Sequence, residues 1–460
     1  MKTCYIDNIK QTRWMKGISF FFLSPLYPFL TAIMTLICHR FGWDMTLIAY
    51  FAVTGCFVAL FMDDTAPVFT VFLFMNVVVS AQNAPTGYGI DREYYVRHLP
   101  GIIVCIAISL LVTLFRMGVN LATGRTKLGI SFYAVVLFSA SLLLNGVGYE
   151  EYVKKNLMYA FFLAILLVFG FVFGAGMKGD ERSFRCIAYA FVFLGLFMLV
   201  ELCERYASVE ELKFDLVYLR SLGFNYGWGS RNTMGMLFCL TIPTTAYLAA
   251  KERCGWLFYA LDYVFLCAAV MTFSRQAMIF APVALLASTV VLLIVSKYRF
   301  IDLSILVAFC VAAFVFYKCN EEVLREDFQK IFETIFTGGD RLPIYQLGWE
   351  NFLTHPWFGV GFFTELPSFS SVESILPQMY HNTVIQILAS CGAVGFLPYL
   401  FHRVCTVISL AKRPSIERIF LFLVVLVLLL LSLVDTHLFN YFPTLVYAAM
   451  IGILAKTEKQ

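Results

Sequence analysis

Three arginines and one histidine stand at the edges of long apolar segments, where an ionisable side chain usually serves a function. Arg231 occurs in GSRNTMGML, Arg275 in TFSRQAMI and Arg341 in GGDRLPIYQLGW. The histidine, His381, occurs in MYHNTVIQIL. Each has an ordinary explanation as well: a snorkelling arginine, an interfacial charge, a salt bridge to a nearby acid, or an interfacial hydrogen bonder.

Together these side chains fit the transfer of a sugar from a diphosphate. Arginine binds a diphosphate through two parallel hydrogen bonds and stays charged. A diphosphate whose charge is neutralised is already a good leaving group, so the remaining task is to remove the proton of the attacking hydroxyl. Histidine exchanges a proton near neutral pH and suits that task.

Other chemistries have little support in the residues. No DxD-type motif marks an external metal site, and Asp63 and Asp64 fall in a predicted cytoplasmic turn, so we expect neither a metal nor another cofactor. The thirteen cysteines are scattered, mostly in apolar runs, which favours packing roles over a disulfide framework or a zinc site. The net charge is only +4 and no basic run occurs, so nucleic acid is not an expected partner.

The composition indicates which solvent surrounds the chain. Of its 460 residues, 60% are hydrophobic and 14% are charged, and the mean hydropathy is +0.79. Soluble proteins are about 45–50% apolar and about 25% charged. Because so few charges cannot cover a water-facing surface of this size, lipid is the solvent that remains.

Apolar segments of about 17–21 residues, long enough to cross a bilayer, recur along the whole chain. We expect about fourteen, at 18–38, 45–62, 66–82, 101–115, 128–146, 157–177, 186–202, 234–250, 257–273, 276–296, 301–317, 383–401, 419–434 and 439–455. The predicted fold is an all-α polytopic transmembrane bundle of about 12–14 helices. We expect the first segment to be a retained helix and not a signal peptide, because it lacks a clear small-residue cleavage site.

The charges predict how these helices are oriented. With the N-terminus inside, the short cytoplasmic connections carry basic residues such as Arg125, Lys251 and Arg403, as the positive-inside rule expects. Both termini then face the cytoplasm, and the long acidic loop 318–382 lies outside.

The acidic loop is predicted to be folded. We expect an amphipathic helix at 321–336 and a second helix at 341–354 that Asp340 caps, followed by a tight turn at Gly359 and Gly361. The chain then divides into N-terminal transmembrane helices (1–233), transmembrane helices with the Ser-Arg motif (234–317), the external loop (318–382) and C-terminal transmembrane helices (383–460).

The sequence resembles the bacterial O-antigen ligase and polymerase superfamily. The resemblance lies in GSRNTMGML, in TFSRQAMI with its Ser-Arg motif, in R-LPIYQLGWENFLTHPWFGVGFF, and in HN-VIQILASCGAVGFLPY. These elements cover about 230–402, with the large loop between the last two spans. The resemblance implies a membrane glycosyltransferase bundle of the C type in the bacterial inner membrane. Its substrate would be a glycan on undecaprenyl diphosphate, and membrane lipid and other polysaccharide assembly proteins would be its partners.

The resemblance also implies roles for individual residues. Arg231 and Arg275 match positions that contact the diphosphate, and His381 matches the proposed base. Arg341 matches the arginine that opens the loop motif. The candidate catalytic residues are His381, Arg275 and Arg231, and the candidate substrate-binding residues are Arg341, Asn382, Asn232 and Ser274. Gln276 departs from the Ser-Arg motif, because Gly or Ser is usual at its position.

Three activities remain open. A polymerase and a ligase share these elements and differ in acceptor, which is another lipid-linked repeat for the polymerase and lipid A core for the ligase. We favour the repeat-unit polymerase, because such chains vary in their N-terminal half. A polysaccharide flippase or other transporter would need charged or broken helices at mid-membrane and usually a twofold repeat. The sequence has few mid-span charges and no evident repeat.

We predict that a reporter fused at Glu350 lies outside the cytoplasm, because the loop around it is acidic and the short loops are basic. A reporter that works only outside the cytoplasm should be active there, and one that works only in the cytoplasm should be silent. A fusion after Gln460 is the control and should give the reverse pattern. Cytoplasmic activity at Glu350 would refute the topology.

Overall fold

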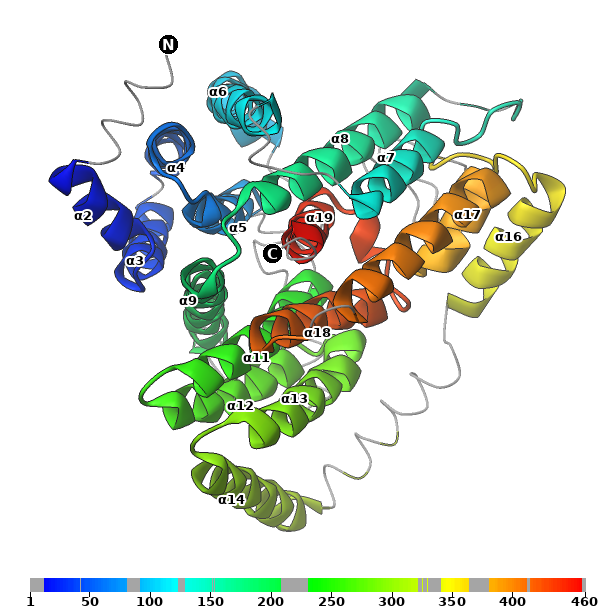
Figure 1. Ribbon diagram of the computed structural model, residues 1–460. Helices are drawn as coiled ribbons and strands as arrows, with labels where there is room; N and C mark the ends of the chain where they lie inside the picture. Colours follow the sequence, from blue (N-terminus) through cyan, green and yellow to red (C-terminus); the bar gives the residue numbers. More distant parts are fainter. Residues whose placement is uncertain are drawn as a thin grey trace. The chain divides into compact units, whose positions relative to one another are not determined.

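The structure is a computed structural model (Figure 1). It describes residues 12–41, 43–80, 92–122, 129–150, 152, 154–207, 231–321, 325, 329, 341–363, 380–411 and 414–456. These residues form sixteen α-helices and one short 3-10 helix, with no strand among them. The all-α prediction is confirmed.

The described helices fall into two compact units that alternate along the sequence. Unit 1 comprises Met1–Ala122 and Met177–Phe332, and unit 2 comprises Thr123–Gly176 and Glu333–Gln460. The helices of unit 1 are α2 (Arg13–Phe22), α3 (Leu26–Arg40), α4 (Asp44–Phe61), α5 (Ala66–Ser80), α6 (Arg92–Ala122), α9 (Glu181–Ala207), α11 (Arg231–Lys251), α12 (Gly255–Met271), α13 (Arg275–Val295) and α14 (Arg299–Cys319). Those of unit 2 are α7 (Ile130–Leu142), α8 (Lys154–Gly176), α16 (Arg341–Thr354), α17 (Thr383–Ala411), α18 (Ile416–Leu431), η1 (His437–Phe439) and α19 (Tyr441–Lys456).

Several of these helices are long and apolar enough to cross a membrane. By length and composition there are six among the described residues, or seven if the bent pair α2 and α3 is counted as one span. Six further apolar helices have 10–17 residues, less than the roughly 20 that a straight span needs. The chain is an integral membrane protein.

The predicted helix boundaries differ from those of the structure at the segment 18–38 and at the end of α17. The segment 18–38 is two helices, α2 and α3, with a bend of 62° between them. Pro25 lies at this bend, where the residue before a proline avoids the helical conformation. In unit 2, α17 continues for ten residues beyond the predicted end at 401, so Arg403 lies inside a helix and not in a connection.

The loop 318–382, which is predicted to lie outside the cytoplasm, is described only in part. The predicted helix at 341–354 is confirmed as α16. The turn at Gly359 and Gly361 is also confirmed, because both residues have positive φ, of 66° and 89°. Asp340 and most of the predicted amphipathic helix at 321–336 lie outside the described residues.

The core of unit 1 is α11, of which 89% is buried. α11 packs closely against α13 at Gly235. A Cβ added at this glycine would lie only 2.7 Å from Ala277 Cβ, so no larger residue fits without a shift. A second tie joins α5 to α9: the buried Asp64 accepts hydrogen bonds from Ala66 N (3.0 Å) and Ser183 Oγ (2.5 Å). The Asp63–Asp64 pair is thus placed at a turn, and Asp64 has a structural role.

The core of unit 2 is the contact between α8 and α19. Gly170 and Gly174 of α8 face small residues of α19, and a Cβ at Gly174 would overlap the carbonyl oxygen of Ala449. Gly452 of α19 comes equally close to the backbone of α8 at Phe171. Small residues four apart let helix backbones touch, which is how helices associate where lipid removes the hydrophobic driving force.

The helix α17 is broken at Gly392, where φ is 60° and ψ is −159°. The segment after α16 runs beside this break and exchanges backbone hydrogen bonds with it. The bonds, donor first, are Val360–Ala389 (2.8 Å), Gly361–Ser390 (3.1 Å), Ala393–Pro356 (2.8 Å) and Val394–Trp357 (3.1 Å). The backbone groups that the break frees therefore find partners within the protein, as a hydrocarbon environment requires.

We predict that Gly392→Ala strongly destabilises the protein. Its φ and ψ are accessible essentially only to glycine, and an added Cβ would overlap the backbone of Trp357. The strain alone costs about 1–3 kcal/mol, and the overlap adds to it. The measurement is the thermal unfolding midpoint in detergent, with Gly118→Ala as control, because a Cβ there meets no atom within 4 Å. An unfolding midpoint of Gly392→Ala equal to the control's would contradict the assigned backbone.

Candidate functional site

Two neighbouring helices of unit 1 open with the predicted arginines. Arg231 is the first residue of α11 and Arg275 the first of α13. The first turns of the two helices are in contact at Gly235. The buried Ser274, which is the N-cap of α13, donates from Oγ to Asn232 Oδ1 at 2.9 Å. The structure therefore brings four of the predicted site residues to one pair of helix ends.

This pair of helix ends has the electrostatics of an anion site. The first N–H groups of a helix lack intrahelical partners, and the helix dipole places a partial positive charge there. Here two such ends adjoin, and each carries an arginine side chain that is partly exposed. Phosphate groups bind at helix N-termini for these reasons.

The structure explains how Gln276 is accommodated in the Ser-Arg motif. Its side chain is buried and donates from Nε2 to the backbone oxygen of Asn232 at 3.1 Å. The amide thus adds a second link between α11 and α13, beside that of Ser274. Asn232, in the first turn of α11, thus bridges the two helices through its side chain and its backbone oxygen.

The predicted base, His381, lies in unit 2 beside an acid that the sequence analysis did not identify. His381 Nδ1 lies 3.0 Å from Oδ1 of Asp435, in the turn between α18 and η1. The His381 side chain is 36% exposed and that of Asp435 only 12%. The same carboxylate oxygen accepts the backbone N–H of Thr436 at 2.8 Å.

The charge of Asp435 follows from these contacts. Burial by itself raises the pKa of the carboxyl group, but the hydrogen bonds from His381 and from the backbone N–H of Thr436 outweigh it and hold the pKa below its usual range. Asp435 is therefore ionised at neutral pH and accepts a hydrogen bond from the Nδ1–H group of His381. This fixes the tautomer of the imidazole and leaves the Nε2 lone pair as the basic site.

Backbone strain occurs beside predicted site residues in each of the two units. Among the described residues, the non-glycine residues with positive φ are Phe273 (52°) and His381 (50°). Phe273 directly precedes Ser274 and Arg275, and His381 is the predicted base itself. Such conformations cost about 1–3 kcal/mol each and persist where the surroundings impose them, most often at functional sites.

The other two predicted residues of unit 2 make contacts that hold the turn around His381. Arg341 donates from Nη1 to the backbone oxygen of Val434, next to Asp435. Asn382 caps α17: its Oδ1 accepts from the N–H groups of Val384 (2.9 Å) and Ile385 (3.1 Å), and its Nδ2 donates to Leu433 O (2.8 Å). Substrate binding by Arg341 and Asn382 stays a prediction.

A signal for Asp435 was present in the sequence. It occurs in LSLVDTHLF, between two apolar segments, where an ionisable residue at the edge of a span is a functional candidate. Among the described residues, no three His, Cys, Asp or Glu side chains are grouped as a metal site would need.

Comparison with known proteins gives one family match. Residues 260–400 match the family model described as O-antigen ligase. This region includes Ser274, Arg275, Arg341, His381 and Asn382, and it ends before Asp435. No curated protein matches the chain.

Proposed function

We propose that this chain, which matches the O-antigen ligase family model over residues 260–400, belongs to the O-antigen ligase and polymerase superfamily and is a repeat-unit polymerase of surface polysaccharide synthesis. It transfers a glycan from undecaprenyl diphosphate to a sugar hydroxyl at the outer face of the bacterial inner membrane, with both termini in the cytoplasm. The observation that carries the proposal is the contact between His381 and Asp435, because it gives an exposed imidazole the tautomer of a general base.

The base step follows from this contact. His381 Nε2 takes the proton of the acceptor hydroxyl as its oxygen bonds to the anomeric carbon of the donor sugar. The bond from that carbon to the diphosphate oxygen breaks, and its electron pair leaves with the diphosphate. Asp435 stabilises the imidazolium that forms, as an orienting carboxylate does in other His–Asp pairs.

As the resemblance implies, Arg231 and Arg275 are proposed to supply the other requirement, which is charge for the leaving diphosphate. Arg231 and Arg275 stand at two adjoining helix N-termini, so side-chain and backbone donors both favour the anion. Such preorganised donors are worth most where negative charge develops during the reaction.

A ligase that transfers the glycan to lipid A core is the second candidate, favoured by the description of the matching family. Reconstitution with a lipid-linked oligosaccharide separates the activities. A longer lipid-linked chain supports the polymerase, and transfer to added lipid A core supports the ligase. Movement across the bilayer without a new bond would point to a flippase and overturn the proposal.

The transfer is proposed to need no metal, because arginine charge takes the place that a cation would fill beside the diphosphate. We expect the reconstituted activity to be unchanged within about twofold in excess chelator. Added magnesium or manganese should not raise it. A strict requirement for either ion would show that the arginines do not suffice.

Because the proposed base acts on the acceptor hydroxyl and the arginines act on the donor, we expect purified variants of the two groups to differ in donor binding and in transfer. His381→Ala should reduce single-turnover transfer by about 10²–10⁴-fold and leave donor binding intact, because the base acts on the acceptor hydroxyl. Asp435→Asn should lower transfer by up to about 10⁴-fold, because the wrong tautomer is then stabilised. His355→Ala is the matched control, since this partly exposed histidine of the same unit contacts Tyr149 and not the site. Near-normal transfer by a folded His381→Ala protein would exclude the base role.

The arginine variants complete this comparison. Arg275→Lys should weaken both donor binding and transfer, because lysine keeps the charge and loses the planar pair of donors. The loss in transfer should be about a hundredfold, or about 3 kcal/mol. Arg231→Ala should behave in the same way. Loss of transfer with unchanged donor binding in both variants would argue against diphosphate contact.

A further inference from the structure

The first described helix, α2, carries basic and aromatic side chains on an exposed face. Arg13, Lys16 and Phe20 are spaced three and four residues apart, so they lie on one side of the helix. Trp14 lies beside Arg13 on the surface. The exposed fraction is 85% for Trp14 and 75% for Phe20, whereas Met15 on the opposite side is buried. This face therefore combines two cations with two large rings that no part of the described chain covers.

The last residue of α2 is held against three other helices of unit 1. The ring of Phe22 stacks on that of Phe57 of α4, with 5.9 Å between centroids, and meets that of Tyr27 of α3 at 4.7 Å. Its backbone oxygen accepts a hydrogen bond from Cys186 Sγ of α9 at 3.7 Å. Phe57 lies one turn before the end of α4, and Cys186 lies in the second turn of α9. Phe22 is thus level with helix ends and not with the middle of a span.

The bend after α2 determines how the helix lies. α3 turns by 62° from the direction of α2 (Figure 1). When α3 runs along the membrane normal, α2 lies about 28° from the membrane plane, with its first residues farthest from the lipid core. A helix of ten residues at this angle stays in the headgroup region, where amphipathic helices bind and where tryptophan is enriched.

The charge of this segment favours an anionic surface. Residues 12–41 contain no acidic residue, and Arg13 and Lys16 are both exposed. Long basic side chains can place their charge among headgroups while their methylene groups cover apolar surface. A second copy of the chain is a poor partner for the same face, because a twofold contact would bring these like charges together.

We propose that α2 is a surface anchor that binds anionic phospholipid headgroups through Arg13 and Lys16. Trp14 and Phe20 enter the boundary between headgroups and acyl chains, and the two cations attract the net negative charge that a zwitterionic lipid lacks. The inference rests on α2 and its neighbours in unit 1, and it is independent of the proposed transferase activity.

The test measures which lipid touches Trp14 in the purified full-length protein. The protein is placed in phosphatidylcholine nanodiscs that contain a rising fraction of brominated phosphatidylglycerol or of brominated phosphatidylcholine. Bromine quenches the fluorescence of a tryptophan that it contacts. Because the chain has six tryptophans, each protein is also measured with Trp14→Phe, and the difference is the signal of Trp14.

Three pairs of substitutions are compared with the wild type. Arg13→Gln with Lys16→Gln removes both charges of the proposed anchor. Arg13→Lys with Lys16→Arg keeps both charges. The matched control is Lys297→Gln with Arg299→Gln, which removes two exposed basic residues at the start of α14 in the same unit.

We expect brominated phosphatidylglycerol to quench Trp14 of the wild type at a much lower fraction than brominated phosphatidylcholine. Each basic residue near an anionic surface gains about 1 kcal/mol, or about fivefold, so two should give about thirtyfold. The double glutamine variant of α2 should lose this preference, and the other two pairs should keep it. Ionic strength of about 1 M should reduce it in the wild type, because the Debye length is then about 3 Å.

Three results would overturn the proposal. Equal quenching of the wild type by both lipids would show membrane contact without headgroup recognition. Quenching by neither lipid would show that Trp14 is not in the membrane and that protein covers this face. An unchanged preference in the double glutamine variant would assign it to other residues. Should that variant fail to fold, the wild type at high ionic strength decides, because a preference that salt leaves unchanged does not come from exposed charges.

Discussion

The backbone hydrogen bonds across the break in α17 are the constraint on which unit 2 depends. A helix in lipid can be interrupted only where other groups accept and donate in place of the lost helical bonds. Here the segment that follows α16 meets that need on both sides of Gly392. The same segment bonds to the other helices of the unit, through Gly146 N to Phe358 O (2.8 Å) and Phe363 N to Asn156 Oδ1 (2.6 Å). At the break, the segment that follows α16 is therefore bonded directly to the helices of unit 2.

The packing of α16 and the segment after it against α17 also explains why His381 has a defined position. α16 leads into the segment that holds the break, and α17 begins two residues after His381, at Thr383. Tyr345 of α16 donates to the backbone oxygen of His381 at 3.2 Å, and Asn382 ties the start of α17 to Leu433. The contact with α16 before His381 and the contact of Asn382 after it together impose the positive φ of His381. A side chain held in this way loses little entropy when it meets a substrate.

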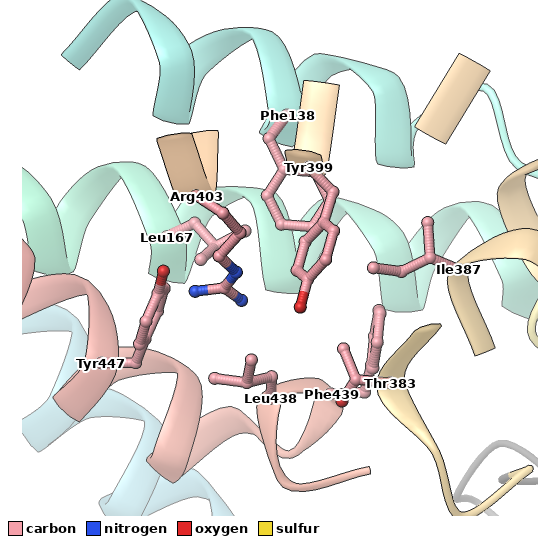
Figure 2. Close-up of a pocket in the computed structure, with 9 residues that line it drawn as sticks. All are labelled: Phe138, Leu167, Thr383, Ile387, Tyr399, Arg403, Leu438, Phe439 and Tyr447. Atoms are coloured by element: carbon pink, nitrogen blue, oxygen red, sulfur yellow. The ribbon is translucent and has the colours of Figure 1, made fainter. Parts of the chain in front are cut away.

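The charged side chains inside the protein illustrate three ways of tolerating a charge away from water. Asp435 pairs with His381 and a backbone N–H. Arg418 is buried and donates to the backbone oxygens of Ser409 and Leu454, so it satisfies the ends of two helices. Arg403 is stacked between aromatic rings (Figure 2). In each arrangement groups of the protein itself, whether a counter-charge, backbone oxygens or aromatic faces, take the place that water has around a charge at the surface.

The sequence by itself determined the fold class, the helical segments and the helix ends that carry Arg231, Arg275 and Arg341. These features depend on local properties: hydropathy summed over a segment, and the change from polar to apolar residues at its edge. It did not determine the bend between α2 and α3, the length of α17 or the surroundings of Arg403. Only the tertiary structure decided that Asp435, 54 residues further along the chain, faces His381, and that Asn382 caps α17. Such pairs depend on which helix ends packing brings together, and no local pattern of residues encodes that contact.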